Sequence, residues 1–285
     1  MSIKAVSHAR QEADADRLTL RLEREGLIVL PGRGFEIAAA ERALIDQAHS
    51  DGRAKNISLG PGGVRGAAAD PVLAGALEAL MSRYRDFARD VIDQVAPRYR
   101  GALQMGRTSL RTRDVAQDSA PSPRRDDRRL HVDAFASQPT GGRRILRVFT
   151  NVDPEPHDRV WRVGEPFEQH ACRFVEGARP LLPGEATLLR ALSITRTRRT
   201  AYDQLMLQIH DRSKLDGAYQ AGAEARELRF APGTSWVVYT DSVVHAAIAG
   251  RCAFEQTLYL PADEMVAPEA SPLRILERLA GRKLI

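Results

Sequence analysis

The feature that most constrains the fold is a series of short apolar segments that begins at residue 103. Each segment has four to nine residues, which is the usual length of a β-strand, and turn-forming residues separate most of them. The seven candidate strands are Leu103–Arg111, Arg129–Phe135, Ile145–Val152, Val160–Val163, Ala225–Phe230, Ser235–Thr240 and Ala253–Leu260. This half of the chain therefore predicts a barrel or a sandwich.

The first hundred residues predict helices around a single strand, Gly26–Leu30. The expected helices are Ala13–Glu25, Glu36–Ala48 and Pro71–Val95. The last of these repeats apolar residues along one face, as a helix packed on a core does. Those residues are Leu73, Leu77, Leu80, Tyr84, Phe87 and Val91.

A second helical block, Ala186–Gln220, interrupts the strands, and a loop is expected at Gln117–Pro123. We expect one domain over residues 1–285. Its parts are helical support in 1–100, the strand-rich core with the insert 186–220 in 101–262, and a C-terminal helix in 263–285.

Cysteine content and apolar runs bear on the compartment. Cys172 and Cys252 are the two cysteines, and they give neither a disulfide framework nor zinc-ribbon spacing, which favours a reducing compartment. Residues 1–8 lack the apolar stretch of a secretory signal, and no apolar run approaches the roughly 20 residues of a membrane helix. These features predict a cytoplasmic protein.

Arginine gives the chain a net charge of +5 and a pI near 9.5. The basic clusters are Arg124–Arg129, Arg143 with Arg144 and Arg147, and Arg196 with Arg198 and Arg199. They are either solvated surface or a sign of an anionic partner such as nucleic acid, anionic lipid or a phosphorylated or carboxylated small molecule. Nucleic acid is disfavoured because no aromatic residues alternate with the arginines and no DNA- or RNA-binding motif is visible.

A candidate metal site lies in the strand-rich half. His131 and Asp133 are two residues apart, so their side chains project from the same face of a strand. His245 follows the strongest strand pattern. Two histidines and one carboxylate form the facial triad of non-haem Fe(II) oxygenases. The alternative is that His131 lies at the surface and His245 is a satisfied core histidine.

The other five histidines are poorer candidates. The sequence places them in helical segments or in a loop, and His210 and Asp211 diverge by about 100° on one helix, so they do not easily share an ion. These histidines are His8, His49, His157, His170 and His210.

Many such oxygenases use 2-oxoglutarate, whose far carboxylate needs a buried cation. Arg147 lies in the apolar run Ile145–Phe149, and its guanidinium suits a carboxylate. Strand alternation places Asn151 on the same face. The alternative for Arg147 is an ion pair with a protein carboxylate, for example Asp133 or Asp153.

Two other arginines are possible anchors. Many oxygenases place the cation about ten residues after the second histidine, where this chain has Glu255. Arg251 lies nearest to that position, and Arg111 faces inward on a preceding strand.

Several blocks resemble a known family, the 3-deoxy-D-manno-oct-2-ulosonic acid (Kdo) hydroxylases of Gram-negative bacteria. They are Lys55–Ser58, Asp126–Phe135, Gly142–Asn151, Arg159–Phe167, Tyr202–Asp211, Asp241–Ala246 and Phe254–Pro261. The resemblance runs from about residue 20 to the C-terminus. We therefore expect an α+β fold with a double-stranded β-helix (jelly-roll, cupin-like) core, N-terminal helices and a helical insert.

The resemblance implies hydroxylation of carbon 3 of Kdo in Kdo–lipid A, with Fe(II), O2 and 2-oxoglutarate consumed. It implies iron ligation by His131, Asp133 and His245. An anionic lipopolysaccharide precursor fits the basic chain and implies peripheral contact with the cytoplasmic face of the inner membrane.

There are three alternatives to this function. The same chemistry could act on another lipid or small acidic substrate, or the barrel could bind sugar or lipid without catalysis. A zinc hydrolase is disfavoured because no general base for a metal-bound water is evident.

Overall fold

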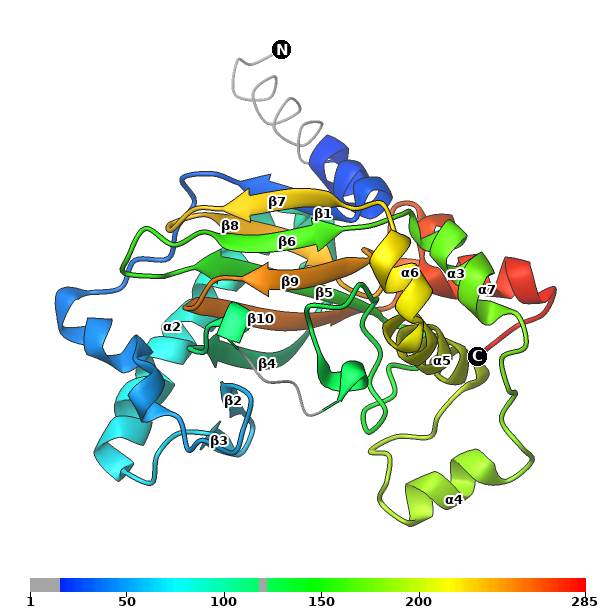
Figure 1. The fold of residues 1–285 in the computed structure, drawn as a ribbon, viewed down its shortest axis with the longest axis horizontal. Helices are drawn as coiled ribbons and strands as arrows, with labels where there is room; N and C mark the ends of the chain where they lie inside the picture. The colour runs from blue at the N-terminus through cyan, green and yellow to red at the C-terminus, as the bar shows by residue number, and fades with distance from the viewer. Residues whose placement is uncertain (1–15, 118–121) are drawn as a thin grey trace.

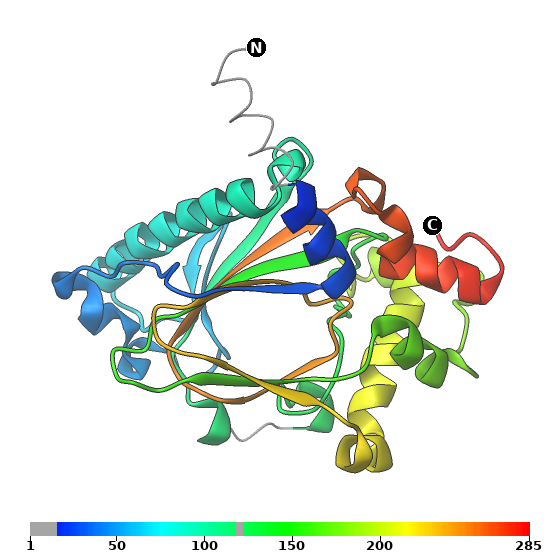
Figure 2. The same ribbon diagram turned by 90° about the horizontal axis from the view of Figure 1, so that it is seen from above.

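The strands form two antiparallel sheets, described here from a computed structural model that covers residues 16–117 and 122–285. The larger sheet has the order β1-β8-β5-β10-β4-β2-β3, and the smaller has the order β7-β6-β9. The larger contains β1 (Leu27–Leu30), β2 (Ile57–Gly60), β3 (Gly63–Arg65), β4 (Gln104–Arg111), β5 (Arg144–Asn151), β8 (Ser235–Tyr239) and β10 (Ala253–Leu260). The smaller contains β6 (Arg159–Val163), β7 (Arg226–Phe230) and β9 (His245–Ala249). Figure 2 shows the sheets facing each other, as expected for this α+β fold.

Aromatic side chains fill part of the space between the sheets. Phe149 on β5 stacks on Trp236 and meets Trp161 of β6 edge-on, with ring centroids 5.2 Å apart in both pairs. Every residue of β5 is buried, because both faces of this central strand are covered. Burial of such large rings is a major stabilising contribution.

Helix α2 (Pro71–Val95) covers the outer face of the larger sheet (Figure 2). It has the predicted bounds, and its amphipathic face packs into the core. Asp70 caps it by accepting hydrogen bonds from the amides of Val72 and Leu73. Residues 16–25 form a second N-terminal helix.

The remaining helices gather at one end of the sheets (Figure 1). They are α3 (Phe167–Val175), α4 (Glu185–Ala191), α5 (Ala201–Leu215), α6 (Gly217–Gly222) and α7 (Pro272–Ala280). Short 3-10 turns occur at η1 (Ala39–Ile45), η2 (Gln47–His49), η3 (Pro97–Tyr99), η4 (Val115–Gln117), η5 (Pro123–Arg125), η6 (Ala262–Glu264) and η7 (Pro268–Ala270). No described helix has the length and apolar character needed to cross a membrane.

Two predicted elements were wrong in type or extent. Glu36–Ala48 forms 3-10 turns because η1 buries only Ile45 fully, which gives too little tertiary packing to stabilise an α-helix. The block Ala186–Gln220 is helical as predicted, and it consists of three helices with a break after α4. Arg129–Phe135 is not a full strand, because only His131 forms a β-bridge before the chain turns toward Thr240.

Other differences are omissions or fall outside the described residues. The expectation of a single strand in the first hundred residues was wrong, since β2 and β3 form a hairpin there. Strand β9 was also not predicted. The C-terminal helix is shorter than 263–285. His8 and parts of the predicted helix Ala13–Glu25 and of the loop Gln117–Pro123 lie outside the described residues.

Candidate metal centre

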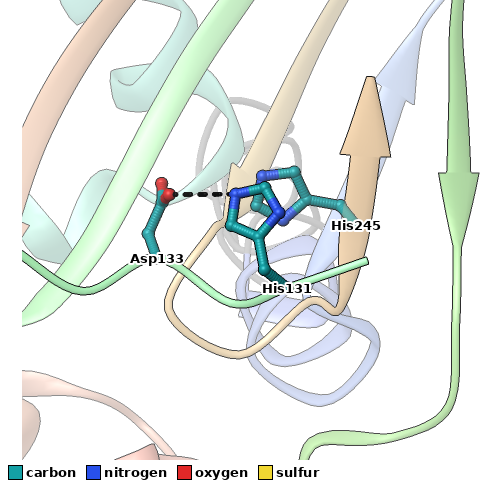
Figure 3. Close-up of side chains that lie close together, drawn as sticks. All are labelled: His131, Asp133 and His245. Carbon is teal, nitrogen blue, oxygen red and sulfur yellow. Dashed lines mark ion pairs between the residues drawn. The ribbon is translucent and has the colours of Figure 1, made fainter. Parts of the chain in front are cut away.

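His131, Asp133 and His245 come together between the sheets (Figure 3). His131 and His245 pair as an isolated antiparallel bridge, with N–H···O distances of 3.0 and 2.8 Å. The Asp133 amide donates to the Thr240 carbonyl at 2.7 Å. These backbone bonds bring two distant segments into register, and the potential ligand atoms of the three side chains all lie within 4.8 Å of one another.

Backbone contacts set the tautomer of both histidines. Nδ1 of His131 lies 2.7 Å from the carbonyl oxygen of Arg129, and Nδ1 of His245 lies 2.8 Å from that of Val243. A carbonyl only accepts, so each Nδ1 carries the proton and donates it. Each Nε2 therefore has a free lone pair. Burial lowers the pKa of both imidazoles, which favours the neutral form that binds metal.

The Asp133 carboxylate is held ionised. Burial acts to raise its pKa, but the nearby Arg147 charge and the two histidines hold the pKa below the ordinary value. Oδ1 lies 3.7 Å from Nε2 of His131. Oδ2 is 2.9 Å from Arg147 without hydrogen-bond geometry, so it has no hydrogen-bond donor among the described residues.

This donor set fits a divalent transition metal. It presents two unprotonated imidazole nitrogens and a partly buried carboxylate with an unsatisfied, buried oxygen. Such groups bind iron or zinc with bonds of about 2.0–2.2 Å. Two histidines and one carboxylate leave the other positions of an octahedral ion open.

Arg147 and Arg111 form a cationic wall beside the triad. Arg147 lies 2.6 Å from Glu255, as well as next to Asp133, so the alternative of an ion pair with a protein carboxylate applies to it. Its Nε has no hydrogen-bond partner among the described residues. Arg111 also binds Glu255, through Nε at 2.9 Å, and lies 3.7 Å from Asp127.

The structure does not bring Asn151 or Arg251 to this wall. The Asn151 amide donates at 2.9 Å to two carbonyls, those of His157 and Phe230, and its oxygen accepts from Asp153. Asn151 is not among the residues that line the cavity around the triad. Arg251 instead pairs with Asp153 at 3.0 Å, and its side chain is 40% exposed.

Sequence reasoning missed Arg159 and Trp161. Both line the cavity of about 40 Å³ that also contains the triad. Trp161 stacks on His245 with centroids 4.9 Å apart, and its Nε1 has no hydrogen-bond partner among the described residues. Strand alternation in Arg159–Val163 is the signal that puts both side chains on one face.

Arg159 differs from the other two cavity arginines. Nη1 donates to the carbonyls of Gly250 at 3.0 Å and Arg251 at 3.3 Å, and no carboxylate pairs with it within the described ranges. Gly250 has φ +103°, and a Cβ there would lie 2.8 Å from the Arg159 backbone, so this approach requires glycine. Burial, followed by the charge of Arg111, lowers the pKa of Arg159 to about 10.

The other described histidines have different partners. His49 contacts the Ala43 carbonyl, His157 pairs with Asp153, His170 with Glu165 and His210 with Asp211. The ring of His210 lies edge-on to His131, with centroids 5.4 Å apart. Among the described residues, none of these histidines belongs to a group suited to hold a metal.

The chain is similar to a known protein family and to solved structures of one of its members. A family model described as 3-deoxy-D-manno-oct-2-ulosonic acid (Kdo) hydroxylase matches residues 5–283. The crystal structure of the Kdo hydroxylase KdoO, a non-haem Fe(II) 2-oxoglutarate-dependent dioxygenase, with cobalt(II) has a TM-score of 0.91. That match has 36% identity and covers 95% of this chain and 91% of that chain. KdoO structures with 2-oxoglutarate and Fe(III) and with succinate and Fe(III) have TM-scores of 0.90, at 35% and 36% identity and the same coverage. No curated protein matches the chain.

Proposed function

The chain belongs to the Kdo hydroxylase family, and on this premise we propose that it hydroxylates carbon 3 of Kdo in Kdo–lipid A, giving D-glycero-D-talo-oct-2-ulosonic acid. The reaction is that of a 2-oxoglutarate-dependent dioxygenase, an oxidoreductase, which consumes Fe(II), O2 and 2-oxoglutarate and releases succinate and CO2. The observation that carries the proposal is the triad of His131, Asp133 and His245 enclosed with three arginines in one cavity.

Bound iron and 2-oxoglutarate would supply the oxidising power, while the protein supplies orientation and a dry site. In this proposal the Nε2 atoms of His131 and His245 and the Asp133 carboxylate bind the metal. The carbonyls of Arg129 and Val243 hold the imidazoles in the metal-binding tautomer.

The charge balance of the cavity supports a dianionic co-substrate. Three arginines, Arg111, Arg147 and Arg159, face three carboxylates, Asp127, Asp133 and Glu255. Lys55, 2.6 Å from Asp127, and Lys214, 3.7 Å from it, add further positive charge, so a divalent ion would leave a surplus of at least two positive charges in this site. Such a surplus is costly unless an anion compensates it. The two carboxylates of 2-oxoglutarate provide that compensation.

We assign the co-substrate to Arg147 and Arg111. Arg147 contacts Asp133 directly, so a ligand at its free Nε lies beside the metal. Arg159 also lines a second hollow of about 20 Å³, which Lys55 and Arg113 border. This position suits contact with the sugar, and the unpartnered Nε1 of Trp161 offers a second donor in the metal cavity, which Arg159 also lines.

The insert supports peripheral contact with a membrane. Four large apolar side chains on and around α4 are each more than half exposed, and α4 lies at the edge of the molecule (Figure 1). They are Leu182, Leu188, Leu192 and Ile194. Exposed apolar residues near Arg190, Arg196 and Arg198 suit an anionic lipid surface, where each cation contributes about 1 kcal/mol. We propose contact with the cytoplasmic face of the inner membrane, where Kdo is attached.

The test is incubation with Kdo–lipid A, Fe(II), O2 and 2-oxoglutarate, followed by mass analysis. We expect one added oxygen on the Kdo residue and an equal amount of succinate. Oxygen-dependent succinate formation with an unchanged glycolipid would indicate another lipid or small acidic substrate. If no oxygen-dependent turnover occurred with any such substrate, the proposed chemistry would be wrong.

A further inference from the structure

A third and larger hollow, of about 660 Å³, lies beyond the metal cavity. Its walls come from the β2–β3 hairpin, α2, β4, the end of β10 and the loop before β5. We name it the arginine groove after five of the residues that line it, Arg65, Arg85, Arg107, Arg143 and Arg196. Glu78 is the carboxylate in its lining. The groove therefore carries a strong positive charge.

Most of these guanidinium groups are not neutralised. Within the part of the chain that the structure describes, no carboxylate pairs with Arg65, Arg107 or Arg196. Arg143 is held by neutral groups, since its Nε donates to the Thr140 carbonyl at 2.8 Å and its guanidinium lies 5.3 Å from the Tyr259 ring centroid. Arginines that converge without a balancing carboxylate repel one another unless an anion joins them.

The groove lies along the same sheet face as the metal cavity. On β10, the side chains of Glu255, Thr257 and Tyr259 alternate onto one face, and the Thr257 hydroxyl donates to Glu255 at 3.1 Å. Glu255 binds Arg147 beside the metal centre, and Tyr259 lines the groove. Four residues of strand span about 13 Å. One elongated ligand can therefore reach both sites.

The lining chemistry selects the class of ligand. A guanidinium group binds two phosphate oxygens at once through parallel hydrogen bonds. Several arginines in one groove therefore suit a doubly charged phosphate. A strand of nucleic acid would need several stacking rings, whereas Tyr259 is the aromatic residue in this lining and Arg143 lies over its ring. The exposed Leu192 and Ile194 precede Arg196 in the chain, which places apolar surface next to the groove.

We propose that the arginine groove binds a phosphate monoester on the lipid-bearing part of the same glycolipid whose Kdo residue lies at the metal centre. The inference rests on the proposed function, because it assigns a second contact to that substrate. Arg107 and Arg196 are its principal donors.

The test compares the double variant Arg107→Gln/Arg196→Gln with the control Arg24→Gln/Arg226→Gln. The control removes the same charge from exposed arginines outside the groove. Substrates are the Kdo-bearing glycolipid with its phosphates and the same molecule after phosphatase treatment. We expect the groove variant to raise KM at least tenfold on the phosphorylated substrate, with kcat unchanged, and to leave KM on the dephosphorylated substrate as in wild type.

Binding of metal-free protein to detergent micelles that contain either glycolipid gives a second readout, independent of turnover. The inference is supported if binding depends on the phosphate, is lost in the groove variant and is kept in the control. This holds even if the wild-type protein leaves Kdo unmodified, a result that counts against the proposed function alone. Equal KM changes on both substrates, or equal losses in groove and control variants, would overturn the inference. The inference would also be overturned if the wild-type protein bound RNA and the groove variant lost that binding while its glycolipid binding stayed unchanged.

Discussion

Replacing Arg147 by methionine tests the co-substrate assignment most directly. The change removes a buried cation and keeps a side chain of similar length. Arg147 lies 2.6 Å from Glu255 and 2.9 Å from Asp133, and its Nε is free for a ligand. A hydrogen bond to a charged group contributes about 1.5–3 kcal/mol, so we expect 2-oxoglutarate binding to weaken by about 2–3 kcal/mol, or roughly 30- to 150-fold in Kd.

The assay is calorimetric titration of 2-oxoglutarate into cobalt-loaded protein without oxygen, so that no turnover occurs. Arg251→Met is the matched control, because Arg251 pairs with Asp153 and lies outside the cavity lining. We expect the control to change Kd by less than about threefold, the scale of an exposed ion pair. Reversed effects in the two variants would refute the assignment to Arg147.

A loss of metal affinity must be separated from a loss of co-substrate affinity. Removing Arg147 leaves the partly buried Asp133 carboxylate without its nearest cation. Arg147→Lys keeps the charge but not the guanidinium fork, so we expect it to restore cobalt binding while 2-oxoglutarate binding stays weak. If lysine restored both affinities fully, charge alone would account for the role of Arg147. Melting temperatures of all variants report whether the fold is retained.

Three further predictions concern the metal, the fold and its cooperativity. Alanine at His131, Asp133 or His245 should abolish turnover and bound metal while circular dichroism stays native, because the ligands act as a unit; near-normal activity of His245→Ala would contradict the site. Asp70→Ala should lower the free energy of unfolding in urea by about 1 kcal/mol, since two amides of α2 lose their acceptor; an unchanged midpoint would show that the cap is dispensable. We propose that the chain is a single domain, because one core cluster joins residues from Leu22 to Met265. Thermal unfolding followed by calorimetry should then give one transition, and two separated transitions would argue against a single domain.

Elements with a strong local pattern were predicted to the residue or nearly so. Helix α2 and strand β10 have the expected bounds, and β5 and β8 differ by one residue at their ends. Their apolar periodicity is set by neighbours in sequence, so it can be read without the fold. Elements that depend on distant packing were missed, such as the hairpin of β2 and β3, which pairs with β4.

The sequence predicted the three residues of the triad, but it did not predict the β-bridge that joins His131 to His245. Spacing alone puts His131 and Asp133 on one face, because alternate residues of an extended chain point the same way. Nothing local relates them to His245, which lies more than a hundred residues later. The backbone bridge between the two histidines, and the carbonyls that fix their tautomers, exist only in the folded chain.

The arginines show where sequence information ends. The residues alone show that the chain is basic and that its arginines cluster, with Arg143, Arg144 and Arg147 in one cluster. Only the tertiary structure divides it: Arg143 lines the groove, Arg144 is fully buried against Asp241, and Arg147 reaches Glu255 across 108 residues of sequence. A charge acts through space with whatever the fold places within a few ångströms, and burial strengthens that action. Composition fixes how many charges exist, while the fold fixes which of them remain free to meet an anion.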